Sequence, residues 1–72
     1  MNRNDVKNLK AKYPAGTVVV LDHMDDKQAP PAGTKGTVTI VDDIGQIHVD
    51  WENGSTLAIV PEADSFHMAH SD

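Results

Sequence analysis

The strongest constraint on the fold is a strict alternation of apolar and polar residues followed at once by a tight-turn signal. In the segment QIHVDW, Ile47, Val49 and Trp51 share one face, and polar residues occupy the other. This period of two is typical of an antiparallel strand with one buried face. Asn53-Gly54 follows and is the preferred pair for a type I′ hairpin turn. The pattern predicts a β-hairpin whose returning strand covers residues 55–60.

Other segments have strand patterns of their own. TVVVL and GTVTIVD are rich in β-branched residues, and SFHM is a weaker candidate. In the second strand, Val38 and Ile40 alternate together, whereas burial of Val38 with Val41 requires a bulge. The expected strands are residues 17–21, 36–42, 46–51, 55–60 and 65–68. The inward-facing residues are expected to be Val19, Leu21, Val38, Ile47, Val49 and Leu57.

The first 13 residues predict a short helix. Val6, Leu9 and Tyr13 form one apolar stripe on a 3.6-residue period, Asn4 can cap the start, and Pro14 ends the helix. A helix this short is marginal alone in water, so its stripe must pack against the strands.

Several short motifs also resemble known families. Five short strands with tight turns after a long first loop resemble small SH3-like barrels, and GTKGTVTIVDDIGQIHVDWENG is similar to the core of KOW-type modules. The chain further resembles an uncharacterised domain-of-unknown-function family carried by phages, plasmids and conjugative elements. The residues that carry this match are Pro14 to Thr17, Leu21 to Asp26, Gly33-Thr34, Gly36 to Val38, Val41 to Ile47, Val49, Trp51, Asn53-Gly54 and Asp64 to Phe66.

The resemblance implies a mainly β fold, a small SH3-like five-stranded antiparallel barrel preceded by one short N-terminal α-helix. Residues 1–72 are expected to form a single domain, with the helix over 1–13, the barrel over 14–68 and a frayed tail over 69–72. The family has no assigned activity, so membership implies no function.

Charge is distributed unevenly along the chain. Residues 1–13 carry four cations against Asp5, a net +3, whereas residues 14–72 carry two cations against ten carboxylates, a net −8. Phosphate backbones require several cations on one face, so the body of the domain disfavours nucleic acid. No apolar run is long enough to span a membrane, and there is no cysteine, which suits a reducing, cytoplasmic location.

Three apolar residues fall on the outer face of the expected barrel. Val18, Val20 and Ile40 stand where members of the resembled family commonly carry polar residues. We expect the helix stripe to cover this face; a second copy of the chain or another partner is the alternative.

The densest polar cluster is Asp22-His23-Met24-Asp25-Asp26, at the start of a long loop. It lacks the glycine and glutamate of an EF-hand and the paired histidines or cysteines of a zinc site. Asp42-Asp43 beside the next turn is expected to bond its own backbone. We expect no catalytic, cofactor-binding or metal-binding residue, because no nucleophile elbow, P-loop or dinucleotide motif occurs. The hypothetical partner-binding residues are Asp22, His23, Met24, Asp25, Asp26, Val18, Val20, Asp42 and Asp43.

The sequence favours a non-enzymatic protein-binding module of a phage or mobile element, which engages its partner through the acidic loop and the outer strand face. A first alternative is an acidic inhibitor of a host defence nuclease, of the anti-CRISPR or anti-restriction type. A second alternative is nucleic-acid binding through the basic N-terminal helix. The identity of the protein partner and homo-oligomerisation stay open.

Overall fold

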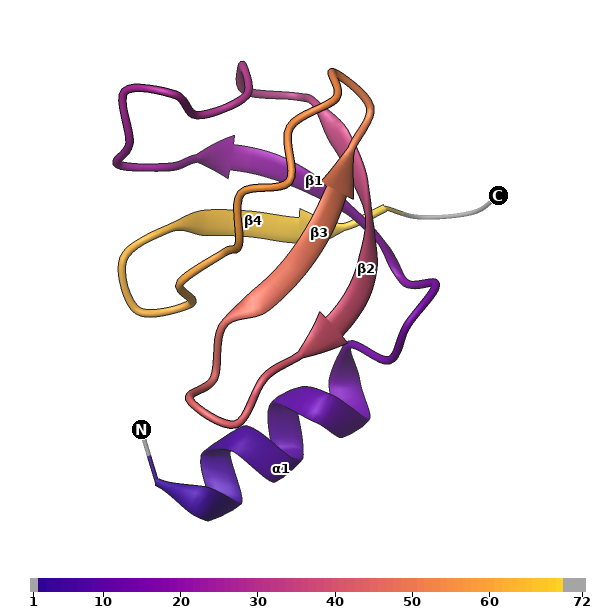
Figure 1. Cartoon of the computed structure of the whole chain (residues 1–72), viewed down its shortest axis with the longest axis vertical. Helices are drawn as coiled ribbons and strands as arrows, with labels where there is room; N and C mark the ends of the chain where they lie inside the picture. The colour runs from indigo at the N-terminus through magenta and orange to yellow at the C-terminus, as the bar shows by residue number, and fades with distance from the viewer. Residues whose placement is uncertain (1, 70–72) are drawn as a thin grey trace.

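The computed structural model describes residues 2–69, which form one helix and four antiparallel strands. The strands make one open sheet in the order β3-β2-β1-β4, so the last strand pairs with the first (Figure 1). The elements are α1 (Arg3–Lys12), β1 (Val18–His23), β2 (Lys35–Val41), β3 (Ile47–Trp51) and β4 (Ser65–Met68). The mainly β class and the helix are therefore confirmed.

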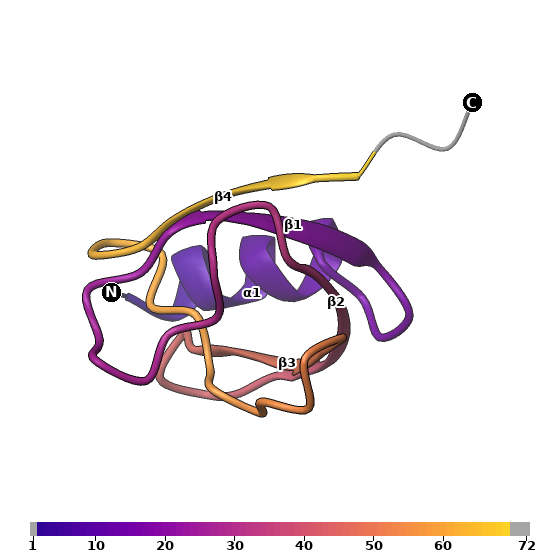
Figure 2. The same ribbon diagram turned by 90° about the horizontal axis from the view of Figure 1, so that it is seen from above.

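The sheet curves strongly, so that β1 and β4 lie across from β3 and β2 joins the two sides (Figure 2). The inward residues of the alternating strands meet in this concave space and are almost fully buried. All of the predicted core residues except Leu57 are at most 1% exposed. The buried cluster comprises Tyr13, Val19, Leu21, Met24, Val38, Val41, Ile47, Val49, Trp51 and Ile59.

A bulge in β2 decides between the two registers that the sequence allowed. Val38 pairs with Val49, but the next pair joins Ile40 to His48, so Thr39 is the extra residue. Val38 and Val41 are consequently both buried, whereas the side chain of Ile40 points outward and is 60% exposed.

The predicted strand over residues 55–60 is wrong. Trp51 N–H donates to Ser55 O, and Ile47 and Ile59 exchange both backbone bonds, at 2.9 and 2.7 Å. Between these ends the indole Nε1–H of Trp51 donates to Leu57 O at 2.9 Å, so this carbonyl does not accept a backbone N–H of β3. The described residues therefore form four strands in an open sheet and not the expected five-stranded barrel, and Ile59 takes the core position predicted for Leu57.

The turn at Asn53-Gly54 also differs from the expected type I′, which needs positive φ at both residues. Only Gly54 has it, at 90°, and Gly54 N–H donates to Trp51 O. This is a three-residue loop in which a type I turn is followed by glycine in the left-handed region. Gly45 has the same role between β2 and β3, with φ 86°.

Helix α1 begins two residues earlier than the predicted cap at Asn4 would place it. Asn2 caps it and not Asn4, because Asn2 and Asp5 form a reciprocal capping box. The helix lies across one end of the curved sheet (Figure 1), and Tyr13 enters the core, with its ring centroid 5.3 Å from that of Phe66. It does not cover the outer face, where Val18 stays 41% exposed; Leu9 and Tyr13 of the stripe pack against the core cluster instead.

The remaining expectations concern the chain's end and membranes. The predicted frayed tail starts at Ala69, whose N–H donates to Val18 O; residues 70–72 lie outside the described residues. Within residues 2–69, the helix is too short and too polar to cross a bilayer.

Candidate binding surfaces

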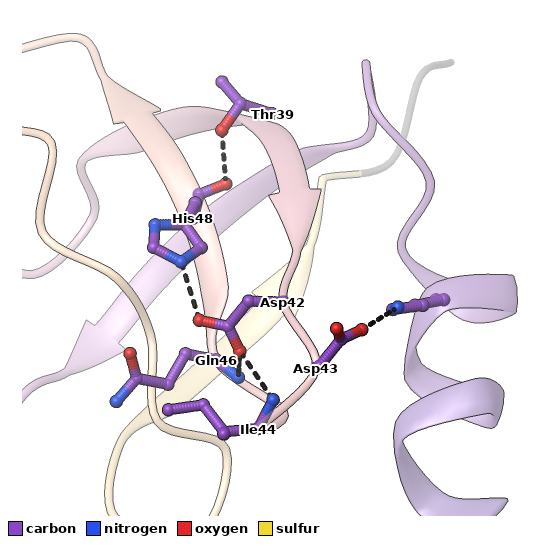
Figure 3. A network of polar contacts seen from close by, with 7 residues as sticks. Thr39, Asp42, Asp43, Ile44, Gln46 and His48 are labelled. Atoms are coloured by element: carbon purple, nitrogen blue, oxygen red, sulfur yellow. Dashed lines mark hydrogen bonds and ion pairs between the residues drawn. The ribbon is translucent and has the colours of Figure 1, made fainter. Parts of the chain in front are cut away.

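The turn between β2 and β3 is organised by the carboxylate of Asp42. Its Oδ1 accepts the N–H groups of Ile44 at 3.1 Å and Gln46 at 2.9 Å, and its Oδ2 lies 2.8 Å from His48 Nε2 (Figure 3). The hydrogen bond from His48, followed by that from Gln46, holds the pKa of Asp42 below its ordinary value of 3.8. Asp42 is thus an internal anchor of the turn, as the sequence predicted for an aspartate at this place.

Asp43, the next residue, faces the helix. Lys10 Nζ lies 2.7 Å from its Oδ1, and the Asp43 side chain is 95% exposed (Figure 3). This ion pair joins α1 to the β2–β3 turn, but an exposed pair is worth little in free energy. Both carboxylates of the predicted pair therefore already have intramolecular partners.

The end of β1 and the loop that follows it form a second acidic region. His23 pairs with Ser65, and the β1–β4 register shifts between Leu21 and His23, which leaves Asp22 at a bulge. There Asp22 Oδ2 lies 2.9 Å from His67 Nδ1 of β4. His67 and His70 stand three residues apart, which is a weak signal for a metal site, but His70 lies outside the described residues.

Asp64, which directly precedes β4, is the fourth carboxylate of this region and bonds to the loop after β1. Its Oδ1 accepts Asp25 N–H at 3.3 Å and its Oδ2 accepts Val60 N–H at 2.8 Å. Asp26 accepts Gln28 N–H at 2.7 Å. We call the set Asp22, Asp25, Asp26 and Asp64 the acidic surface.

Met24 does not belong to the acidic surface, although the sequence placed it in the partner-binding loop. It is 8% exposed and packs in the core beneath the loop. His23 is exposed, Val18 is 41% exposed, and Val20 is half-buried between Lys35 and His67.

Strand β4 is in contact with part of the acidic surface through the Asp22–His67 pair. β4 is the last strand of the sheet, so within residues 2–69 no strand pairs with its outer side. The opposite edge, that of β3, is covered by the Ser55 and Ile59 contacts. Within the described residues the sheet therefore presents one edge without a backbone partner; Asp22 contacts this strand through His67, and Asp64 directly precedes it.

The structure separates residues that the sequence grouped as one binding set. Asp25 and Asp26 lie in the loop between β1 and β2, whereas Asp42 and Asp43 lie in the β2–β3 turn next to α1 (Figure 1). Residues 2–69 contain no group of three histidine, aspartate or glutamate side chains arranged to hold a metal ion.

Sequence reasoning missed the roles of His48 and Asp64. His48 was expected to be an exposed strand residue, but it is half-buried and bonded to Asp42. The pairing of Val41 with Ile47 places Asp42 and His48 near each other around the β2–β3 turn, so antiparallel pairing of the strands expected at residues 36–42 and 46–51 would have indicated this contact. The contact between Asp64 and Asp25 joins residues 39 positions apart and had no local signal.

Comparison with known proteins gives a family and no further relative. No curated protein and no solved structure matches the chain. A family model described as "Domain of unknown function (DUF4314)" matches residues 2–69, the whole described fold, including the helix, both turns and β4. The chain therefore belongs to the DUF4314 family.

Proposed function

We propose that this protein is a non-enzymatic binding module that adds an extended segment of a partner protein to the free edge of β4, beside the acidic surface. The observation that carries the proposal is the combination, within residues 2–69, of an unpaired outer edge of β4 with acidic residues that contact this strand or directly precede it: Asp22 lies against His67, and Asp64, which accepts Asp25 N–H, comes just before Ser65. An edge strand offers a row of backbone donors and acceptors, and an extended peptide pairs with such a row.

The charges around this edge specify the partner's chemistry. Asp22 and Asp26 each use one carboxylate oxygen in an internal bond and Asp64 uses both, whereas Asp22, Asp25 and Asp26 are all exposed. The partner segment should therefore carry lysine or arginine residues near its paired strand. Val18 and Val20 on the outer face of β1 supply apolar contact area next to it.

The wider setting of the proposal follows the family resemblance. The curved open sheet is proposed to be a variant of the SH3-like, KOW-type architecture, encoded by a phage, plasmid or conjugative element. Absence of cysteine from the sequence suits action in the cytoplasm.

A second candidate is an inhibitor of a host defence nuclease, favoured by the net charge of −8 on residues 14–72. Such a charge complements the cationic groove in which a nuclease holds nucleic acid. Binding would then depend on total charge and salt, and not on pairing with β4.

The test uses a synthetic peptide of alternating lysine and valine and follows the backbone amides of β4 by NMR titration. We expect shift changes in β4 and loss of binding when alternate peptide amides are N-methylated, because methylation removes the donors needed for strand pairing. The double variant Asp25→Asn with Asp26→Asn should weaken binding, and Glu52→Gln, an exposed acid elsewhere, should not.

Two results contradict the proposal. If the N-methylated peptide binds as well as the parent, the contact is purely electrostatic, which favours the nuclease inhibitor. If neither peptide shifts β4, the edge is not a binding site.

A further inference from the structure

A second face of the molecule, at α1, has the opposite charge and its own surface hollows. Two open concavities meet at Lys10. The first, of about 620 Å³, is lined by Asn2, Arg3, Val6, Lys7, Lys10 and Asp43. The second, of about 260 Å³, is lined mainly by Tyr13, Pro14, Ala15, Ile40 and the stem of Lys10. Neither includes a residue of the acidic surface.

The first concavity is cationic. Arg3, Lys7 and Lys10 follow one another at four and three residues along α1, which places them on one face of the helix. Lys10 is paired with Asp43. Within residues 2–69 no ion pair involves Arg3 or Lys7, so their charges are uncompensated.

The second concavity is apolar, and the β2 bulge produces it. The extra residue in β2 turns Ile40 outward, where it is 60% exposed beside Pro14 and the ring of Tyr13. An exposed aliphatic side chain next to an apolar hollow favours contact with an apolar partner group.

We infer that this face, which we call the helix groove, binds an acidic peptide segment that carries one large apolar side chain. The apolar side chain enters the hollow at Ile40, and the peptide's carboxylates lie over Arg3 and Lys7. Charge complementarity supports this occupant, since the cations of α1 are the main positive feature of a protein of net charge −5.

The same charges disfavour two other occupants. A nucleic acid would meet only a few cations here, together with Asp43 and a body of net charge −8. A second copy would bring another net charge of −5 against the first.

Selection from a displayed library of random peptides, with the whole protein as bait, tests the inference. We expect enrichment of peptides in which aspartate or glutamate flanks a single leucine, phenylalanine or tryptophan. Binding of an enriched peptide, measured by fluorescence anisotropy, should weaken about tenfold in Lys7→Glu and in Ile40→Ser.

Each variant has a matched control on the same protein. Lys35→Glu reverses an exposed cation outside the helix groove, and Ile44→Ser removes an aliphatic residue that is 72% exposed and lines neither concavity. Both controls should bind like the parent. Asp25→Asn should also leave this affinity unchanged, which separates the helix groove from the proposed β4 site.

Three results would overturn the inference. The first is a selection without an acidic consensus, and the second is equal peptide binding by the variants and their controls. The third is that the helix groove binds nucleic acid or a second copy of the protein instead of an acidic peptide. The last case would appear as Lys7-dependent binding of duplex DNA in a mobility shift, or as Lys7-dependent dimerisation in sedimentation.

Discussion

The turns at the two ends of β3 have the same backbone bonding but lead to different structures. In the first, Asp42 N–H donates to Gln46 O and Gly45 N–H donates to Asp42 O; in the second, Trp51 bonds in the same way to Ser55 and Gly54. The first turn joins two regular strands. After the second turn the chain runs back along β3 in the register of a hairpin, since Ile47 still pairs with Ile59. No β-ladder forms between this pair and the Trp51–Ser55 bond.

The difference lies in the side chain at the first position of each turn. The carboxylate of Asp42 bonds only to the turn and to His48, and leaves the ladder intact. The indole of Trp51 takes Leu57 O, a carbonyl from the middle of the returning segment. A strand pattern is therefore overruled when a buried side chain requires the carbonyl that the ladder would use.

The largest effect is expected at Gly36, which pairs with Trp51 across β2 and β3. A Cβ at this position would lie 2.6 Å from Trp51 Cε3 and would also contact Val49 Cγ1. Gly36→Val should cost about 3 kcal/mol, because backbone or indole must move. Urea unfolding measures it, with Gly54→Ala as comparison: there φ is 90° but space is open, so about 1 kcal/mol is expected. Equal losses would show that the indole is not wedged against Gly36.

Trp51→Phe tests the other half of the comparison. The phenyl ring keeps most of the apolar volume but leaves Leu57 O without its donor, so we expect a loss of about 2 kcal/mol in the free energy of unfolding. The substitution should accelerate amide hydrogen exchange more at Ile59, in the segment that the indole holds, than at Val38 in β2. Unchanged exchange at Ile59 would mean that the indole bond does not hold the segment in place.

Asp42→Asn should have a smaller effect that depends on pH. The pKa of Asp42 is lowered in the folded protein, so its contribution to stability is complete above 3.8 and is lost as the pH falls below that value. The variant should be less stable than the parent at neutral pH, and the two should converge in acid. Urea unfolding on both sides of pH 3.8 measures this, with exposed Asp50→Asn as the control; a constant difference at every pH contradicts it.

Asp43→Asn is expected to have the smallest effect, about 0.5 kcal/mol or less, because the pair with Lys10 is exposed. Thermal unfolding in low and high salt measures it. A loss much larger than this, or one that persists in high salt, would mean that the pair positions α1.

Most of the fold was predictable because local patterns encode it. The alternation in β3, the β-branched run of β1 and the stripe of α1 place their buried residues correctly, whereas the run of β2 left two registers open. The cap of α1 was also readable: with Asn2 as cap, Asp5 stands at the third helical position, where a carboxylate completes the capping box, whereas Asn4 would place Lys7 there.

What could not be predicted depends on contacts between distant segments. Asp64 meets Asp25, and Tyr13 packs against Phe66, only after the sheet has curved. The sequence therefore identified acidic residues as candidates but not which of them lie together. It grouped Asp42 and Asp43 with the acidic loop, whereas in the structure Asp42 bonds within the β2–β3 turn and Asp43 pairs with Lys10 of the helix. The helix groove had no sequence signal beyond the basic helix. The sequence allowed two registers for β2, and only the one with a bulge exposes Ile40.

The pairing of β4 with β1 has a consequence for the order of folding. Asp22 and His67 are 45 residues apart, whereas β2 and β3 are joined by a short turn. Closing so long a loop costs more chain entropy and slows the search for native contacts. We therefore expect the β2–β3 hairpin to form first and β4 to pair last, and we expect β4 to be the first strand to detach when the native state fluctuates.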